Sequence, residues 1–203
     1  MKIAILGATG TFGTALTEAL LKDTDYHLVL ISRHAEDAYQ SGTRVTALNA
    51  DAADAEQLKG ALQGADVVFC AISGEQLPIV AQNLVDAMSQ LSISRLLFMG
   101  AVGIYNEIPV DMDDDDNLDN QPAQVPNRLA VDVIEASSLN YTILRPGYLR
   151  EGSADDYVLT MKGELAKGYI STIPSVVAIT EKLLMDESLY VRQSVSITKN
   201  MEV

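Results

Sequence analysis

Three glycines near the amino end of the chain have the spacing of a phosphate-binding turn. Gly7, Gly10 and Gly13 form the pattern Gly-x-x-Gly-x-x-Gly, directly after an apolar run and before a stretch with helical periodicity. Gly7 permits a tight turn, Gly10 removes a Cβ that would obstruct a ligand, and Gly13 lets the helix pack against the sheet. Because N–H groups at a helix N-terminus bind diphosphates, the turn predicts an adenine dinucleotide site. The alternative is a purely structural strand-to-helix turn.

The residues after the second apolar run predict which dinucleotide is preferred. NAD sites place a carboxylate about twenty positions after the glycines, where it accepts a hydrogen bond from the adenosine ribose. Here the residues are Ser32, Arg33 and His34. Arg33 is placed to form charge-assisted bonds to a 2′-phosphate, so we expect NADP(H) to be preferred over NAD(H). The alternative is a solvated surface arginine, and His34 either assists it or is plain surface.

Two further segments follow apolar runs and extend the expected site. After the third apolar run, residues 44–48, Asp51 is positioned to accept a hydrogen bond from the adenine amine, and Ala52 is positioned to pack on the adenine ring. Capping or turn formation explains Asp51 equally well. After the fourth run, the segment Ala71-Ile72-Ser73 places small residues where a ribose and diphosphate would pass.

Short apolar runs alternate with helical patterns along the chain, which is typical of an α/β fold with a Rossmann-type doubly wound parallel sheet. We expect one domain over residues 1–203, with the sheet order 3-2-1-4-5-6 and a small C-terminal cap at about 147–175. The stretch 103–125 has no periodicity and contains the acidic run 111–116, so we expect an exposed loop there. The expected strands are 2–6, 26–32, 44–48, 66–71, 95–99, 141–145 and 194–198, and the expected helices are 14–22, 54–64, 78–91, 127–137 and 175–185.

Composition excludes several classes of function. The 203 residues are 48% hydrophobic, enough for a core, and carry a net charge of −14. That charge repels nucleic acids and anionic membranes, and no basic stripe with aromatic residues offsets it. One cysteine and two histidines do not have the spacing of a zinc site, so we expect no metal. With no long apolar stretch, the expected location is cytoplasmic.

Six segments together resemble the NmrA-like, NAD(P)-binding branch of the atypical short-chain dehydrogenase/reductases. They are 7–13, 32–33, 51, 71–74, 99–105 and 141–147. The resemblance implies NADP(H) across the carboxyl edge of the sheet, with Met99 and Gly100 near its middle and Pro146 and Gly147 near the nicotinamide. The expected cofactor-binding residues are Gly7, Ala8, Thr9, Gly10, Thr11, Phe12, Gly13, Ser32, Arg33, Asp51, Ala52, Ala71, Ile72, Ser73, Met99, Gly100, Ala101, Arg128, Pro146 and Gly147.

The chain departs from this superfamily at its catalytic positions. The usual serine corresponds to Ala101, and the nearest match to the Tyr-x-x-x-Lys pair is Gln124 with Arg128. Glutamine is no acid, and a guanidinium stays protonated at any working pH, although Arg128 is placed to touch the nicotinamide ribose. Tyr105 is the candidate for a substitute acid, and packing is the alternative interpretation of this residue.

Hydride transfer without a protein acid favours particular acceptors. Reduced quinones and flavins are delocalised anions that take a proton from water, so an NADPH-dependent reductase of such a small molecule is expected. The segment 148–170, with Tyr157, Met161 and Tyr169, either roofs the acceptor or forms the core of a small appendage. A different class of protein is a redox sensor that binds NAD(P) and reports to a protein partner, with the acidic loop 111–119 as its docking surface. The alternative interpretation of that loop is a solvated surface, and a homo-oligomer is a separate possibility. A sugar-nucleotide epimerase is the third possibility.

Overall fold

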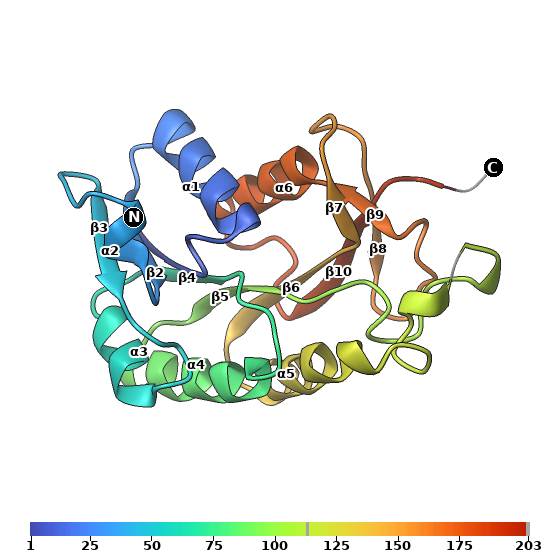
Figure 1. Ribbon diagram of the computed structural model, residues 1–203, viewed down its shortest axis with the longest axis horizontal. Coiled ribbons are helices and arrows are strands. Elements are labelled where there is room, and N and C mark those ends of the chain that lie inside the picture. Colours follow the sequence, from blue (N-terminus) through green and yellow to red (C-terminus); the bar gives the residue numbers. More distant parts are fainter. Residues whose placement is uncertain (113, 202–203) are drawn as a thin grey trace.

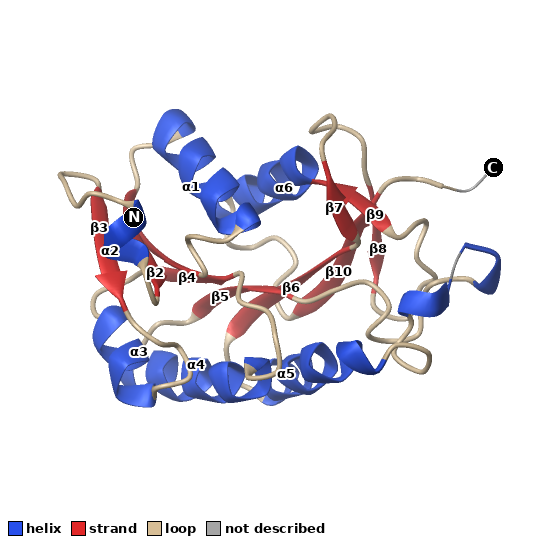
Figure 2. Ribbon diagram, in the orientation of Figure 1, coloured by secondary structure: helices blue, strands red, loops and turns tan. Residues whose placement is uncertain are grey.

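The computed structural model describes residues 1–112 and 114–201, which form three layers around a mostly parallel sheet (Figures 1 and 2). The sheet order is β3-β2-β1-β4-β5-β6-β10-β8, and only the pair β10 and β8 is antiparallel. The α/β fold and the predicted order of the first six strands are therefore confirmed. The strands are β1 (Lys2–Leu6), β2 (His27–Ser32), β3 (Val45–Asn49), β4 (Val67–Cys70), β5 (Arg95–Met99), β6 (Asn140–Pro146), β8 (Val158–Met161) and β10 (Gln193–Thr198).

Helices cover both faces of the sheet. Helices α1 and α6 pack together on one face, and α3, α4 and α5 lie side by side on the other (Figure 1). A short helix, α2, follows β2. The bounds are α1 (Thr11–Asp23), α2 (Ala35–Ala38), α3 (Ala55–Ala61), α4 (Leu77–Leu91), α5 (Val125–Ala136) and α6 (Ile173–Met185).

Local sequence signals explain where several helices begin. The Asp54 carboxylate accepts from the N–H groups of Glu56 and Gln57 at 3.1 and 3.0 Å, which caps α3 at the start of the helix expected over 54–64. Helices α4, α5 and α6 each carry a proline in their first turn, where a missing N–H has no cost.

The central strands are buried on both faces. Along β1, Ile3 and Ile5 belong to the core under α1 and α6, whereas Ala4 and Leu6 belong to the core above α3 to α5. All four side chains are fully buried. An apolar run without alternation is therefore what a central parallel strand requires.

The carboxyl-terminal part contributes more to the sheet than expected. Within the segment predicted as a small cap at 147–175, β8 pairs with β10 and extends the main sheet. Only β7 (Tyr148–Arg150) and β9 (Ile170–Thr172) form a separate parallel pair. The division into a core and a cap remains a prediction.

The described residues of the stretch 103–125, which leave out 113, form more structure than a simple exposed loop, so that expectation is corrected. It contains three short 3-10 turns, Val110–Met112, Asp114–Asp116 and Pro122–Gln124. Asn117 is buried, and its side chain pairs with the N–H and the carbonyl of Ile108 at 3.0 and 2.8 Å. Such side-chain bonds hold a loop without any hydrophobic period.

Within the described ranges, no helix is both long and apolar enough to cross a bilayer. The same residues bring no three acidic, histidine or cysteine side chains together as metal ligands.

Candidate functional site

The turn between β1 and α1 is shaped by backbone contacts that require glycine. Gly7 has a φ of +78°, and a Cβ there would lie 2.9 Å from the carbonyl oxygen of Ala71. The N–H groups of Gly7 and Ala8 both donate to the carbonyl of Ile31, at 2.9 and 3.3 Å. The turn is thereby fixed against the ends of β2 and β4.

Gly10 and Gly13 have different roles in this turn. Gly10 is the N-cap of α1, and no side chain caps the first N–H groups of that helix, so they remain available to an anion. A Cβ at Gly13 would stand 2.2 Å from the Gly7 carbonyl oxygen. Gly13 therefore allows the helix to pack on its own turn, rather than on the sheet as the sequence suggested.

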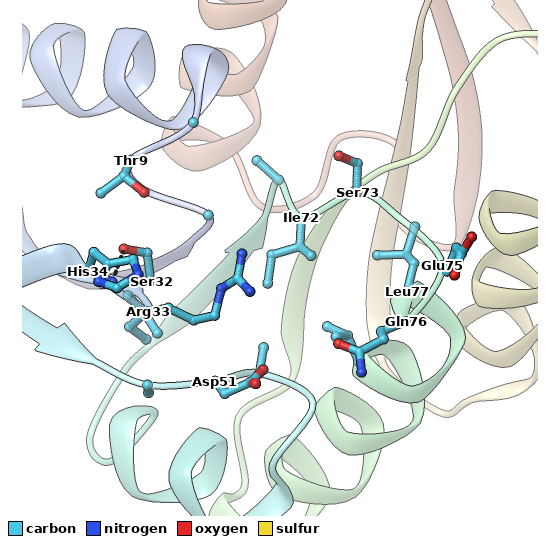
Figure 3. Close-up of a pocket in the computed structure, with 17 residues that line it drawn as sticks. Thr9, Ser32, Arg33, His34, Asp51, Ile72, Ser73, Glu75, Gln76 and Leu77 are labelled. Carbon is cyan, nitrogen blue, oxygen red and sulfur yellow. Dashed lines mark hydrogen bonds between the residues drawn. The ribbon is translucent and has the colours of Figure 1, made fainter. Parts of the chain in front are cut away.

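A cavity of about 430 Å³ opens at the carboxyl ends of β1 to β4 (Figure 3). It lies where a doubly wound fold binds its ligand, and its volume suits a small organic molecule. Ten of the predicted cofactor-binding residues line it: Gly7, Thr9, Gly10, Ser32, Arg33, Asp51, Ala52, Ala71, Ile72 and Ser73. The remaining lining residues are Ile31, His34, Ala50, Glu75, Gln76, Leu77 and Val80.

Arg33 reaches into this cavity, between the glycine turn and Asp51 (Figure 3). Within the described chain, its guanidinium has no hydrogen bond or ion pair. The neighbouring His34 instead faces Asp37, with 3.4 Å between Nδ1 and Oδ2. An unpaired guanidinium keeps all five donors for an anionic ligand.

Asp51 lies at the opposite wall and also holds its own turn. One of its carboxylate oxygens accepts from the N–H of Ala53 at 2.9 Å, and its own N–H donates to the Gln57 side chain at 3.1 Å. The turn-forming interpretation of Asp51 is therefore confirmed. Asp51 also lines the cavity, and its contact with adenine remains a prediction.

Several predicted cofactor residues do not line this cavity. Ala8 and Phe12 are buried, and the Phe12 ring packs on Phe69 with 5.5 Å between centroids. Thr11 is an exposed residue of the first turn of α1. Met99 and Gly100, at the end of β5, line neither this cavity nor the second one described next.

A second, smaller cavity of about 130 Å³ opens beyond the ends of β5 and β6. Three predicted residues, Ala101, Pro146 and Gly147, line it. The others are Val102, Asp116, Gln124, Tyr148 and Tyr169. Both cavities lie at the carboxyl edge of the sheet, as expected for the two halves of a dinucleotide site with its acceptor.

Gln124, the nearest match in the sequence to the superfamily tyrosine, holds the loop beside this cavity in place. Its Nε2 donates to the carbonyls of Val102 and Asp116, both at 3.1 Å, and its Oε1 accepts from Asn127 at 2.9 Å. The amide is therefore used by the protein itself. Ala101 likewise offers no hydroxyl to a ligand.

Tyr105 and Arg128 lie in neither cavity. The Tyr105 hydroxyl is 2.8 Å from Glu135 Oε1 and 3.1 Å from Ser194 Oγ. Burial raises the pKa of this phenol. Arg128 stacks over the Tyr105 ring at 4.7 Å and pairs with Asp132 at 2.5 Å. The structure thus favours the packing interpretation of Tyr105 and brings neither candidate catalytic residue to the site.

The sequence pointed only partly to the second cavity. Tyr169 was expected in a roof and lines the cavity, whereas Tyr157 packs in the core with α1 and α6. Tyr148 directly follows Gly147, so its position at the strand end was a usable signal. Asp116 was missed, since the acidic run was interpreted as a solvated surface.

A doubly wound sheet with a glycine turn and an open carboxyl edge is the architecture of dinucleotide-binding Rossmann proteins. Residues 7–185 match the family described as NAD(P)H-binding, and the chain belongs to that family. The chain is 27% identical over 184 residues to a Bacillus subtilis protein named as an uncharacterized sugar epimerase, YhfK; the match covers 84% of this chain and 82% of that protein.

Solved structures give the same fold. A short-chain dehydrogenase/reductase from Veillonella parvula, in complex with NADP, is 28% identical with a TM-score of 0.88, covering 98% of this chain and 95% of that one. A Rossmann-fold NAD(P)-binding family protein from Shigella flexneri is 28% identical with a TM-score of 0.82, covering 98% and 94%. The NmrA-like branch remains a prediction.

Proposed function

We propose that this protein is an NADPH-dependent reductase of a small, flat acceptor such as a quinone or flavin. The observation that carries the proposal is the unpaired Arg33 guanidinium inside the larger cavity, where NAD-specific sites have a carboxylate. The open N-terminus of α1 and the Gly7 turn suit a diphosphate, and Arg33 suits a 2′-phosphate.

NADPH, when bound, supplies a hydride from its nicotinamide ring. The protein's own part is to bind and orient the cofactor. The glycine turn would hold the diphosphate and Arg33 the 2′-phosphate, and the Pro146-Gly147 segment would lie beside the nicotinamide and the acceptor. Ala101, Gln124 and Tyr148 surround the second cavity. Two lining residues, Tyr148 and Tyr169, carry a phenolic hydrogen, and the Tyr148 hydroxyl donates its hydrogen to Asp116 at 2.8 Å.

The replacement of the superfamily's serine and Tyr-x-x-x-Lys residues by Ala101, Gln124 and Arg128 determines the acceptor class that we propose. A ketone that accepts hydride becomes a strongly basic alkoxide and needs a proton in the transition state. A quinone that accepts hydride becomes a delocalised hydroquinone anion, which takes its second hydrogen as a proton from water. The site is therefore suited to the second reaction.

Steady-state NADPH oxidation across quinones, flavins, aldehydes and ketones tests the proposal. We expect turnover with quinones or flavins and little with simple carbonyls. Turnover confined to carbonyl compounds contradicts the proposal. Tight NADPH binding without turnover on any acceptor supports the redox sensor instead.

The name of the Bacillus subtilis relative favours the epimerase alternative, but the residues that an epimerase needs are not found at the matching positions of this chain. A sugar epimerase of this superfamily uses the Tyr-x-x-x-Lys pair, and Gln124 and Arg128 stand at the nearest match. Gln124 holds the loop, and Arg128 is paired with Asp132 outside both cavities. We therefore rank epimerisation below reduction.

A further inference from the structure

Asp116, the last residue of the acidic run, is held at the second cavity by contacts to its backbone. Gly103, with a φ of +92°, approaches so closely that a Cβ there would lie 2.3 Å from the Asp116 carbonyl oxygen. Gln124 donates to the same carbonyl. The next residue, Asn117, is buried, and the oxygen and nitrogen of its side-chain amide both form hydrogen bonds with the backbone of Ile108. Asp116 therefore has a fixed position, unlike the exposed Asp111 and Asp115.

The side chain of Asp116 brings a negative charge to the cavity wall. Its Oδ1 accepts from the Tyr148 hydroxyl at 2.8 Å, which orients the carboxylate but leaves its charge in place. Among the described residues, no lysine, arginine or histidine forms an ion pair with Asp116. Basic side chains of α5, β6 and the turn after β8 pair with other carboxylates: Arg128 with Asp132, Arg145 with Glu107 and Lys162 with Glu135. Arg150 lies over the Tyr148 ring, 5.6 Å from its centroid, and forms no ion pair with Asp116.

The size of the cavity makes this charge decisive for the acceptor. At about 130 Å³, the cavity holds one or two rings, so a charged group on such a ring has little room to move away from Asp116. Like charges a few ångströms apart repel even near solvent. The net charge of −14 acts in the same direction at longer range.

We infer that Asp116 makes the second cavity a site for neutral flat acceptors and selects against acceptors with an anionic group on the ring. The inference rests on the proposed reductase function, and it narrows the substrate class from quinones and flavins in general to uncharged ring systems. Asp116 acts here as a specificity residue, through its charge, and takes no part in hydride transfer.

A matched pair of acceptors tests the inference: a naphthoquinone and its ring-sulfonated analogue. The measured quantity is the ratio of kcat/KM for the sulfonate to kcat/KM for the neutral quinone, so that the different reduction potentials cancel between variants. Asp116→Asn should raise this ratio by about 3- to 10-fold. Asp111→Asn removes the same charge from an exposed position outside the cavity, and should change the ratio by less than about twofold.

Two further measurements support the same comparison. Dissociation constants of the two quinones, measured by calorimetry with NADP⁺ present, should shift in the same direction without any turnover. In the unmodified protein, added salt should raise the sulfonate-to-neutral ratio, because screening weakens the repulsion. The salt series also tests the inference if Asp116→Asn does not fold.

The outcomes separate this inference from the proposed function. Quinone turnover with a ratio that neither Asp116→Asn nor salt changes overturns the role of Asp116 and leaves the reductase proposal intact. A ratio that changes equally in Asp111→Asn also overturns it, since the effect is then one of net charge. Absence of turnover with every acceptor overturns the reductase function and this inference together.

Discussion

Replacing Arg33 by alanine should separate the two nicotinamide cofactors. The Arg33 guanidinium has no hydrogen bond or ion pair within the described chain, so the variant loses no internal polar interaction and a selective loss of NADPH affinity reports on the ligand. A charge-assisted hydrogen bond contributes about 1.5–3 kcal/mol. Because Arg33 is exposed in the free protein, we take the lower part of that range, about 1.5–2 kcal/mol, which corresponds to roughly 10- to 30-fold in affinity.

Isothermal titration with NADPH and NADH measures this effect directly. For Arg33→Ala we expect the dissociation constant of NADPH to rise by roughly 10- to 30-fold and that of NADH by less than about twofold. Lys22→Ala is the matched control, since it removes one positive charge from an exposed side chain of α1 outside the cavity. An equal loss for both cofactors, or a similar loss in Lys22→Ala, refutes the reasoning.

Three further predictions concern the framework of the site. Gly13→Ala should lower the free energy of unfolding by about 1–3 kcal/mol in urea titrations, because its Cβ meets the Gly7 carbonyl, whereas Gly60→Ala in α3 has open space and should be neutral or stabilising. Burial raises the pKa of Tyr105 above its usual value of 10.0, so the folded state holds the phenolic proton more tightly than the unfolded state does. The stability that this difference contributes is complete below pH 10.0, the pKa in the unfolded state, and is lost as the pH rises through the pKa in the folded state. Tyr105→Phe should therefore flatten the alkaline decline in melting temperature while NADPH affinity is retained, and a loss of affinity contradicts its placement outside the site. Cys70 is buried, which raises the pKa of its thiol to about 12, so a thiol reagent should label it only at the rate of unfolding; fast labelling of the folded protein contradicts that burial.

The sequence predicts those parts of the fold and of the site that depend on residues close together in the chain. The apolar runs from β1 to β6 alternate with helical patterns, and this alternation predicts a parallel sheet and its order. The glycine turn and Arg33 follow strands directly, so their place at the carboxyl edge follows from topology. The cavity at β1 to β4 accordingly collects ten of the expected residues.

The second cavity depends on contacts that the hydrophobic periodicity of the sequence does not predict. Asp116 is positioned by Gly103 and Gln124, which are 13 and 8 residues away in a stretch without hydrophobic periodicity. Tyr105 follows β5, as a site residue would, but its ring turns toward Glu135 and Ser194. These placements result from side-chain hydrogen bonds between distant segments, which sequence patterns alone do not specify.

Isotope effects test hydride transfer without a protein acid most directly. Quinone reduction would be followed with NADPH deuterated at the transferred position of the nicotinamide C4, in ordinary and in heavy water. We predict a primary isotope effect on kcat/KM and no additional slowing in heavy water, because the proton arrives from solvent after hydride transfer. A solvent isotope effect of similar size that disappears in Tyr148→Phe or in Tyr169→Phe would contradict the proposal and identify that tyrosine as a proton donor.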